Sequence, residues 1–396
     1  MVESVKEEVL KYKNYLLLQG PKGFFFYKLG KYLQTLGKTV YKINFNGGDL
    51  MTYPTFRNVY NYRDKLENFE EYLRNFISTK KIEIVLLYGD YKVYHRIAVK
   101  VCKDLNIPLY VFEEGYIRPY YITLEKYGIN GFSQLPKDPE FYRKLPPIEV
   151  EEPLPVNFSY LKQTLSRAFH YICLELLWWY FPNYVFTKNY RPYLPWVFCW
   201  IRGLIRKPIY LYKERPLFKK ILKLRKKYFL VVLQVHDDTQ IHLHSDYRSV
   251  EDFIADVIYS FSRYADPDKY LVLKHHPVDR GFKDYRRLID RLSERLNLKG
   301  RVFYIHDMWL PTLIKGSLGV ITINSTVGLQ ALYHNIPVKV MGRAVYDIPG
   351  LTFQGSLEDF WKNPGQIDRE LYRKFRAYVI KTRQLNGSFW GRFPFD

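Results

Sequence analysis

Short apolar runs alternate with amphipathic stretches along much of the chain. In the first third, the runs have the length of buried strands, and the stretches between them carry apolar residues at helical spacing. The predicted strands are residues 14–19, 39–45, 82–88 and 108–112, and the predicted helices lie near 24–36, 62–79 and 92–105. This regular alternation indicates a parallel sheet covered by helices on both faces.

The same rhythm returns after residue 228. Strand-like runs such as YFLVVLQV and KYLVLKH alternate with helices predicted near 248–264, 282–296 and from about Thr326. We therefore predict an α/β protein with two doubly wound, Rossmann-like domains that face a cleft. The predicted boundaries are an N-terminal domain over 1–135, a linker and insert over 136–228, and a C-terminal domain with terminal helices over 229–396.

Charge and aromatic content set the insert apart. The segment from Pro153 to Leu230 holds 15 Lys or Arg against only Glu175 and Glu214, a net of +13 within a whole-chain charge of +21. It also holds 20 aromatic residues, and basic residues beside Trp and Tyr are typical of helices in the headgroup region of an anionic membrane. The tryptophans predicted to face the membrane are Trp178, Trp179, Trp196 and Trp200.

An ordinary helical insert with an aromatic core and solvated lysines is the structural alternative for this segment. A nucleic-acid surface is a third interpretation, but no DNA- or RNA-binding signature accompanies the charge, so nucleic acid is not an expected partner. The three cysteines are too few for a disulfide framework, and no apolar run reaches the roughly 18 residues of a membrane-spanning helix. The low cysteine content favours a reducing cytosol and the start is not a signal peptide, so we expect a cytoplasmic protein.

Two adjacent acids follow the strand predicted at 108–112. Glu113 and Glu114 precede Gly115, which permits a tight turn, and Arg118. Ligands of open α/β sheets bind at the carboxyl ends of strands, so this pair is a candidate general acid or base. Adjacent acids alone are more often a solvated turn, and their position after a buried strand favours the catalytic interpretation.

Two later strand ends carry candidate phosphate ligands. Lys274, His276 and Pro277 follow KYLVL, and a histidine held by a proline can donate to a phosphate oxygen while the lysine adds charge. Ser325 and Thr326 stand at a predicted helix start, where hydroxyls cap the helix and free N–H groups also favour phosphate. The simpler alternatives are a buried turn histidine and capping alone.

A cluster of acids and histidines follows the strand that ends at Gln234. It begins with His236, Asp237 and Asp238 and continues to Asp246, a density that invites a metal-site interpretation. No HExxH or paired-cysteine pattern supports one, so neither a metal nor a cofactor is expected. The loop that begins with Gln19 and Gly20 is neither GxGxxG nor a P-loop, which makes it a secondary candidate for ligand binding.

Together these motifs resemble the capsule-biosynthesis KpsS (LipB-like) family, from about residue 15 to about residue 362. The segments that carry the resemblance are QGPKGFFF, NFNGGD, FEEGYIRP, ITLEKYGINGFSQLP, LQVHDDTQIHLHSD, KHHPVDRG, NSTVGLQAL and YDIPGLTFQGSLEDFW. This family resembles other retaining β-Kdo glycosyltransferases, including KpsC, of GT-B-like fold. The resemblance maps the family's acid pair, His-Pro turn and Gln-Val-x-x-Asp segment onto Glu113, Glu114, His276, Pro277, Gln234 and Asp238.

The resemblance implies transfer of 3-deoxy-D-manno-oct-2-ulosonic acid (Kdo) from CMP-β-Kdo to a phosphatidylglycerol or lysophosphatidylglycerol acceptor, the first step of a poly-Kdo linker. The implied partners are CMP-Kdo, this anionic phospholipid, the inner face of the cytoplasmic membrane and a partner Kdo transferase.

Retention by double displacement would use Asp238 as nucleophile and Glu114 as base, with Lys274, His276, Ser325 and Thr326 stabilising the departing phosphate. Exchanged carboxylate roles and a front-face mechanism stay open. So do a metal-dependent phosphohydrolase and a non-catalytic protein that binds or exports capsule glycolipid.

Overall fold

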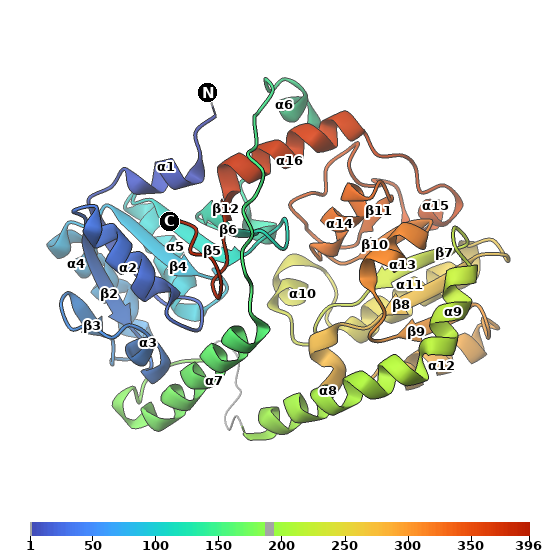
Figure 1. Cartoon of the computed structure of the whole chain (residues 1–396), viewed down its shortest axis with the longest axis horizontal. Helices are drawn as coiled ribbons and strands as arrows, with labels where there is room; N and C mark the ends of the chain where they lie inside the picture. The colour runs from blue at the N-terminus through green and yellow to red at the C-terminus, as the bar shows by residue number, and fades with distance from the viewer. Residues whose placement is uncertain (1, 187–193) are drawn as a thin grey trace. The chain divides into compact units, whose positions relative to one another are not determined.

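The computed structural model describes residues 2–186 and 194–396, with the backbone alone at 194–197, 239, 240 and 242. It contains two compact units, each with its own sheet (Figure 1). The first unit comprises residues 1–134, 147–189 and 376–396, and the second comprises 135–146 and 190–375.

The first unit is built on a seven-stranded sheet in the order β12-β6-β5-β4-β1-β2-β3. Strands β1 to β5 are parallel, and β6 and β12 extend one edge as antiparallel strands. The strands are β1 Asn14–Leu17, β2 Thr39–Asn44, β3 Val59–Asn61, β4 Ile84–Tyr88, β5 Leu109–Glu114, β6 Tyr121–Lys126 and β12 Gln384–Asn386. The helices are α1 Val5–Leu10, α2 Phe25–Thr35, α3 Gly47–Thr52, α4 Phe69–Lys80, α5 Val93–Asp104 and α7 Tyr160–Leu176, with 3-10 turns η1 Leu66–Asn68, η2 Asn130–Phe132 and η3 Trp178–Tyr180.

The second unit is built on a wholly parallel five-stranded sheet in the order β11-β10-β7-β8-β9. The strands are β7 Tyr228–Val232, β8 Tyr270–Lys274, β9 Val302–Ile305, β10 Gly319–Thr322 and β11 Val338–Val340. The helices are α6 Pro139–Arg143, α8 Leu194–Lys213, α9 Arg215–Lys223, α10 Thr239–His244, α11 Val250–Tyr264, α12 Arg286–Arg295, α13 Leu310–Gly316, α14 Val327–Tyr333 and α15 Leu357–Lys362, with the 3-10 turn η4 Pro277–Gly281. Helix α16, Arg369–Arg383, begins in this unit and ends in the first.

Burial on both faces explains why the central strands are apolar without alternation. In the first unit, Tyr110 and Phe112 of β5 join a core shared with α2. Leu109 and Val111 of the same strand join a second core shared with α4 and α5. Successive side chains of a strand point to opposite faces, so one strand supplies two cores.

Both sheets reverse their strand order at one point. Strand β1 lies between β2 and β4, and β7 lies between β8 and β10. The chain leaves the central strand towards one side and later returns on the other, which opens a crevice at the carboxyl ends of the two strands. Each unit therefore has one place where its topology favours a ligand.

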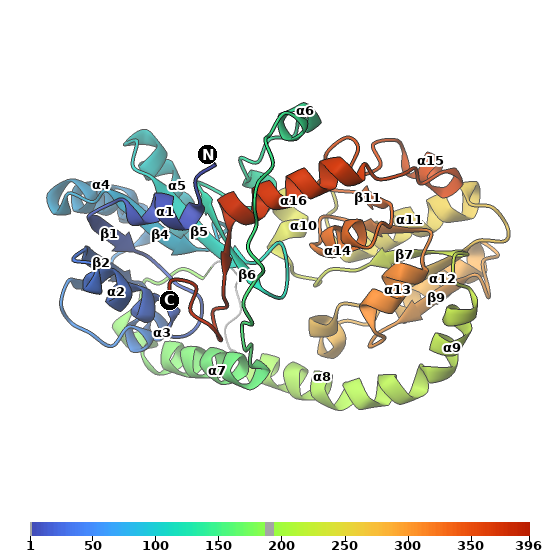
Figure 2. The ribbon, with the colours of Figure 1, turned by 45° about the horizontal axis from the view of Figure 1, so that its top comes forward.

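The basic aromatic segment contributes to both units. In the first, α7 packs on α3 so closely that a Cβ on Gly47 would lie 2.3 Å from the carbonyl oxygen of Cys173. In the second, α8 runs along the unit and leads into α9, as both ribbon views show (Figure 2). The facing glycines Gly203 of α8 and Gly281 of η4 allow a similarly close approach.

The prediction of an α/β protein with two Rossmann-like halves is confirmed. The boundaries of the two units differ from the domain boundaries predicted from the sequence. The predicted insert is divided near residue 189, and residues 376–396 belong to the first unit. There β12 pairs with β6, and the aromatic rings of Phe389 and Trp390 enter the core beside α2. The sequence pattern did not predict β6, β12 or α3.

Candidate active site

In the second unit, Gln234 and Asp238 lie where the strand order reverses. Gln234 follows β7 and Asn324 follows the neighbouring β10. The Gln234 amide donates to Asn324 Oδ1 at 2.9 Å and accepts from the Asn324 backbone N–H at 3.1 Å. The same amide nitrogen lies 3.4 Å from Asp238 Oδ2, so this carboxylate stands at the crevice of the sheet.

The residues after β10 form a tight turn into α14. The Ser325 hydroxyl accepts a hydrogen bond from the backbone N–H of Val327 at 3.2 Å, as expected for a residue that helps to start a helix. Thr326 is the N-cap residue, and its side chain makes no capping bond. Their phosphate contacts stay a prediction.

The His-Pro turn follows β8. His276 is the N-cap of η4, and its Nδ1 accepts from the Val278 N–H at 3.2 Å, so a neutral ring carries its proton on Nε2. Pro277 is exposed as the first residue of the turn. The predicted role of His276 as a phosphate donor fits this tautomer.

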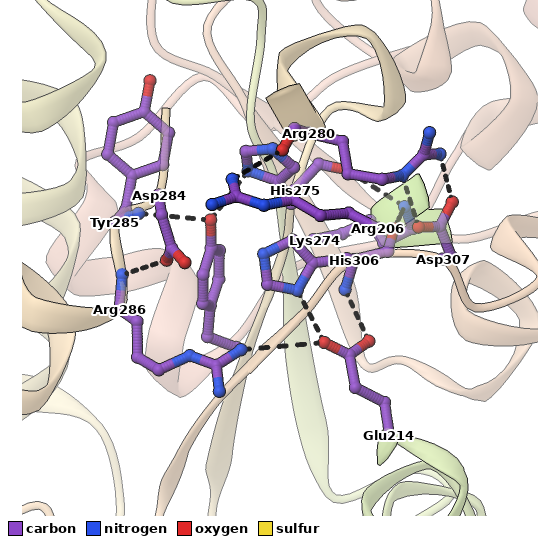
Figure 3. A network of polar contacts seen from close by, with 11 residues as sticks. Arg206, Glu214, Lys274, His275, Arg280, Asp284, Tyr285, Arg286, His306 and Asp307 are labelled. Carbon is purple, nitrogen blue, oxygen red and sulfur yellow. Dashed lines mark hydrogen bonds and ion pairs between the residues drawn. The ribbon is translucent and has the colours of Figure 1, made fainter. Parts of the chain in front are cut away.

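Lys274 has a different environment from the one that the sequence suggested. Its ammonium is buried and donates to the carbonyl oxygens of His275, at 3.0 Å, and His306 (Figure 3). Burial lowers the pKa of Lys274 to about 8, against the smaller opposing effect of Asp307. These contacts tie the ends of β8 and β9 together, and its predicted phosphate contact would compete with them.

A buried polar network supports the His-Pro turn from the side of α8 and α9. Glu214 accepts from the ring Nδ1 of His306 at 2.6 Å and from its backbone N–H at 2.8 Å. Tyr210 of α8 stacks on this ring, with ring centroids 3.8 Å apart. Arg280 of η4 pairs with Asp307 (Figure 3). The network was not predicted, because its members are spread over more than 90 residues.

His236 and Asp279 form a second pair that sequence reasoning missed. Asp279 lies in η4 and is fully buried, and its two oxygens accept from the backbone N–H and ring Nδ1 of His236. Asp237, a secondary candidate, is half-buried beside this histidine. The sequence signal that could have found this pair is that each partner lies in one of the motifs, His236 in QVHDD and Asp279 in HPVD.

The metal-site interpretation gains no support from the described side chains. His236 is bound by Asp279, and His244 is buried, which lowers its pKa to about 4. Among the described residues, no three His, Cys, Asp or Glu are grouped in a way that could hold a metal ion.

In the first unit, Gln19 lies at the corresponding crevice, directly beyond β1. Its amide donates to Asp49 Oδ2 at 2.9 Å and to the Tyr184 hydroxyl at 3.2 Å, and its buried Oε1 has no hydrogen-bond partner among the described residues. Gly20 follows, where a Cβ would lie 2.8 Å from the Phe26 ring. This crowding explains the glycine without requiring a ligand.

The carboxylate pair ends β5. Glu113 is half-buried, and burial raises its pKa to about 7 despite the hydrogen bonds that it accepts from the Glu114 backbone and Tyr88. Adjacent strand residues point to opposite faces, so the two carboxylates have different surroundings. A Cβ on Gly115 would lie 1.9 Å from a backbone oxygen of Tyr121, and the exposed Arg118 donates to the Gly115 carbonyl at 3.1 Å.

Lysines surround the crevice of the first unit. Lys92 is the N-cap residue of α5, which follows β4, and Lys42 is buried near Asp49. Burial lowers the pKa of each lysine to about 8. Lys22, on the loop after β1, lies 4.1 Å above the ring of Tyr171 in α7. Burial lowers the pKa of His170 to about 4, and the positive charges of the three lysines contribute to this decrease. An anion bound at this crevice would favour the charged forms of Lys42 and Lys92.

Comparison with known proteins decides the family. A family model described as capsule polysaccharide biosynthesis protein matches residues 83–390. The capsule polysaccharide export protein KpsS of Escherichia coli is 41% identical over 387 residues, which cover 96% of this chain and 98% of that protein. The capsule polysaccharide modification protein LipB of Neisseria meningitidis serogroup A is 40% identical over 392 residues, covering 97% and 93%. The chain belongs to the capsule polysaccharide biosynthesis protein family.

The resemblance inferred from the sequence motifs is thereby confirmed, and the KpsS and LipB relatives are matched over nearly the whole chain. Among solved structures, the capsule family protein is similar to the β Kdo 2,7 transferase KpsC of Thermosulfurimonas dismutans. That match has 17% identity and a TM-score of 0.43, and covers 92% of this chain and 89% of the other.

The two long helices of the basic aromatic segment expose apolar side chains. Trp178 and Trp179, just beyond α7, are 55% and 63% exposed, and Trp200 of α8 is 41% exposed. The side chain of Trp196 lies outside the described residues. Other exposed apolar residues include Leu161, Leu165, Ile172 and Leu176 of α7, and Phe198, Ile201, Leu204, Ile205 and Tyr212 of α8. No described helix has the length and apolar content needed to span a membrane.

Proposed function

We propose that this capsule family protein is a retaining glycosyltransferase that moves Kdo from CMP-β-Kdo to a phosphatidylglycerol or lysophosphatidylglycerol acceptor. The observation that carries the proposal is the carboxylate of Asp238, which Gln234 holds at the topological switch point of the second sheet. Nucleotide ligands of doubly wound sheets bind at this point, and the His-Pro turn ends the neighbouring strand β8.

The reaction would proceed in two displacements. An oxygen of Asp238 attacks the anomeric carbon of Kdo while the bond from that carbon to the phosphate oxygen breaks, and CMP leaves. The acceptor hydroxyl then attacks the same carbon, gives its proton to a base, and breaks the ester to Asp238. His276 would donate to the departing phosphate in the first step.

The carboxylate pair of the first unit supplies the candidate base. Glu114 was the residue favoured from the sequence, and Glu113 now has the stronger physical case. Its pKa of about 7 lies near neutral pH, where a proton acceptor with this pKa is efficient. Proton transfer is therefore proposed for the pair, with Glu113 as the first residue to test.

An anionic lipid acceptor at the inner face of the cytoplasmic membrane is supported by two sets of residues. The three lysines around the crevice of the first unit favour a phosphate-bearing head group. The exposed apolar stripes of α7 and α8 carry basic neighbours such as Arg167 and Lys207, a combination typical of interfacial helices.

The test is mass spectrometry of the acceptor after incubation with CMP-Kdo and vesicles that contain phosphatidylglycerol or its lyso form. We expect one added Kdo with wild-type protein, none with Asp238→Asn, and near-normal transfer with the control Asp290→Asn, exposed on α12. Release of phosphate that needs added metal or is abolished by a chelator, with no Kdo added to the acceptor, would favour the phosphohydrolase class instead.

A non-catalytic role is the second candidate, because the Escherichia coli relative is named an export protein. A protein of that kind would bind the glycolipid and leave its mass unchanged. Rapid quenching without acceptor adds a sharper distinction, since an adduct of Kdo mass on Asp238 requires catalysis. An adduct on Glu114 would exchange the proposed roles, and transfer without any adduct would favour a front-face mechanism.

A further inference from the structure

The His236–Asp279 pair holds one imidazole ring in a fixed orientation. Asp279 is fully buried in η4, and its Oδ2 accepts from the His236 backbone N–H at 2.6 Å while its Oδ1 accepts from the ring Nδ1 at 2.5 Å. The ring lies against Phe282, with centroids 5.7 Å apart and planes at 27°. Two hydrogen bonds and a ring contact therefore fix the orientation of the imidazole.

The opposite edge of the same ring is open. The His236 side chain is 20% exposed, and among the described residues its ring makes a polar contact with Asp279 alone. The comparable pair, His306 and Glu214, is closed, since the His306 side chain is 1% exposed. A buried carboxylate behind an accessible imidazole is an arrangement that orients the ring for a ligand.

We propose that the imidazolium of His236, held by Asp279, binds an oxyanion of the donor, so that Nε2–H donates to a negatively charged oxygen next to the anomeric carbon. The ligand class rests on the proposed function. CMP-Kdo carries two such groups on this carbon, the nucleotide phosphate and the sugar carboxylate, and Asp238 stands only two residues further along the chain. Asp279 is thus a positioning residue that acts through the histidine.

The charges around His236 favour the protonated ring. Its pKa is raised, chiefly by the hydrogen bond to Asp279, with smaller contributions from the charges of Asp279 and Asp237. Partial burial and Lys283 act in the opposite direction. When the ring is neutral, Nδ1 keeps its proton for Asp279, and Nε2 becomes an acceptor that repels an oxyanion. Affinity for the oxyanion should therefore fall as the pH rises through the raised pKa.

The test compares CMP with cytidine by calorimetry at pH 7. His236→Asn keeps a donor to Asp279 and removes Nε2, so CMP affinity should fall roughly 10- to 100-fold while cytidine affinity stays unchanged. The wild-type preference for CMP over cytidine should weaken as the pH rises above about 6.5, the ordinary pKa of histidine, because the pKa of His236 is raised. Asp279→Asn should move that loss to lower pH. The control His334→Gln, at the end of α14, should match wild type.

The same variant distinguishes the two oxyanions. A phosphate contact weakens CMP itself, whereas a carboxylate contact leaves CMP unchanged and raises the KM for CMP-Kdo. The dyad is wrong if His236→Asn binds both CMP and CMP-Kdo like wild type, or if cytidine affinity falls equally. Wild-type protein that binds no CMP would overturn the donor class, and with it the ligand assigned to His236.

Discussion

The close approach of α8 to the His-Pro turn can be tested with two glycines that face each other. A Cβ on Gly281 would lie 1.8 Å from the backbone oxygen of Cys199, so Gly281→Ala must push α8 away from η4. Overpacking costs about 1–3 kcal/mol, and the upper end applies because a backbone atom cannot rotate aside. The shift also threatens the hydrogen bonds from Arg202 to the Gly281 carbonyl and from Arg206 to the Arg280 carbonyl, at about 1 kcal/mol each.

The expected loss is therefore roughly 3–5 kcal/mol in the free energy of unfolding, or on the order of 10 °C in melting temperature. Gly203→Ala is the matched control, because its Cβ would meet the nearest atom, Gly281 N, at an ordinary 3.4 Å. Alanine inside a helix gains about 0.5–1 kcal/mol over glycine, so this variant should equal or exceed wild type. Denaturant unfolding followed by tryptophan fluorescence measures both, and the packing argument fails if the two variants behave alike.

Three other predictions concern single groups. Glu113→Gln should remove the rise of kcat/KM with pH around 7 that a base of this pKa produces, whereas Glu114→Gln should keep it; the reverse result would return the role to Glu114. Trp178→Ala with Trp179→Ala, or Trp200→Ala alone, should reduce sedimentation with phosphatidylglycerol vesicles, while Trp309→Ala, exposed on the second unit outside α7 and α8, should not. Between pH 8 and 10.5 the folded lysine at position 274 has lost its proton while the unfolded one keeps it, so the free energy of unfolding of wild type should increase as the pH rises. Lys274→Met should remove this increase. Equal pH profiles of stability for the two proteins would contradict burial of the amine.

Residues close to apolar runs could be placed from the sequence. Gln234, His276 and Ser325 follow runs that form β7, β8 and β10, so their location at strand ends followed from the pattern alone. The direction of a side chain did not follow. Lys274 ends β8 as expected, yet its ammonium turns inward to two carbonyl oxygens, which no local spacing reveals.

Pairings over long separations were beyond sequence reasoning for a different reason. His236 and Asp279 are 43 positions apart, and each stands in a motif that already had another interpretation. The edge strand β12 is three residues long and contains Gln384 and Asn386, so it lacks the apolar signature of a strand. Its partner β6 supplies the hydrogen bonds, from more than 250 residues away.

The return of residues 376–396 to the first unit bears on how the chain is made. Synthesis starts at the N-terminus, so β1 to β6 leave the ribosome long before the strand that completes their sheet. Until then the aromatic surface around Phe25 and Phe112 lacks Phe389 and Phe393, which cover it in the finished protein. Every residue of the second unit has been synthesised by position 375, so that unit can close first. A ribosome that stops before residues 376–396 are made would therefore damage the part of the protein that it made first.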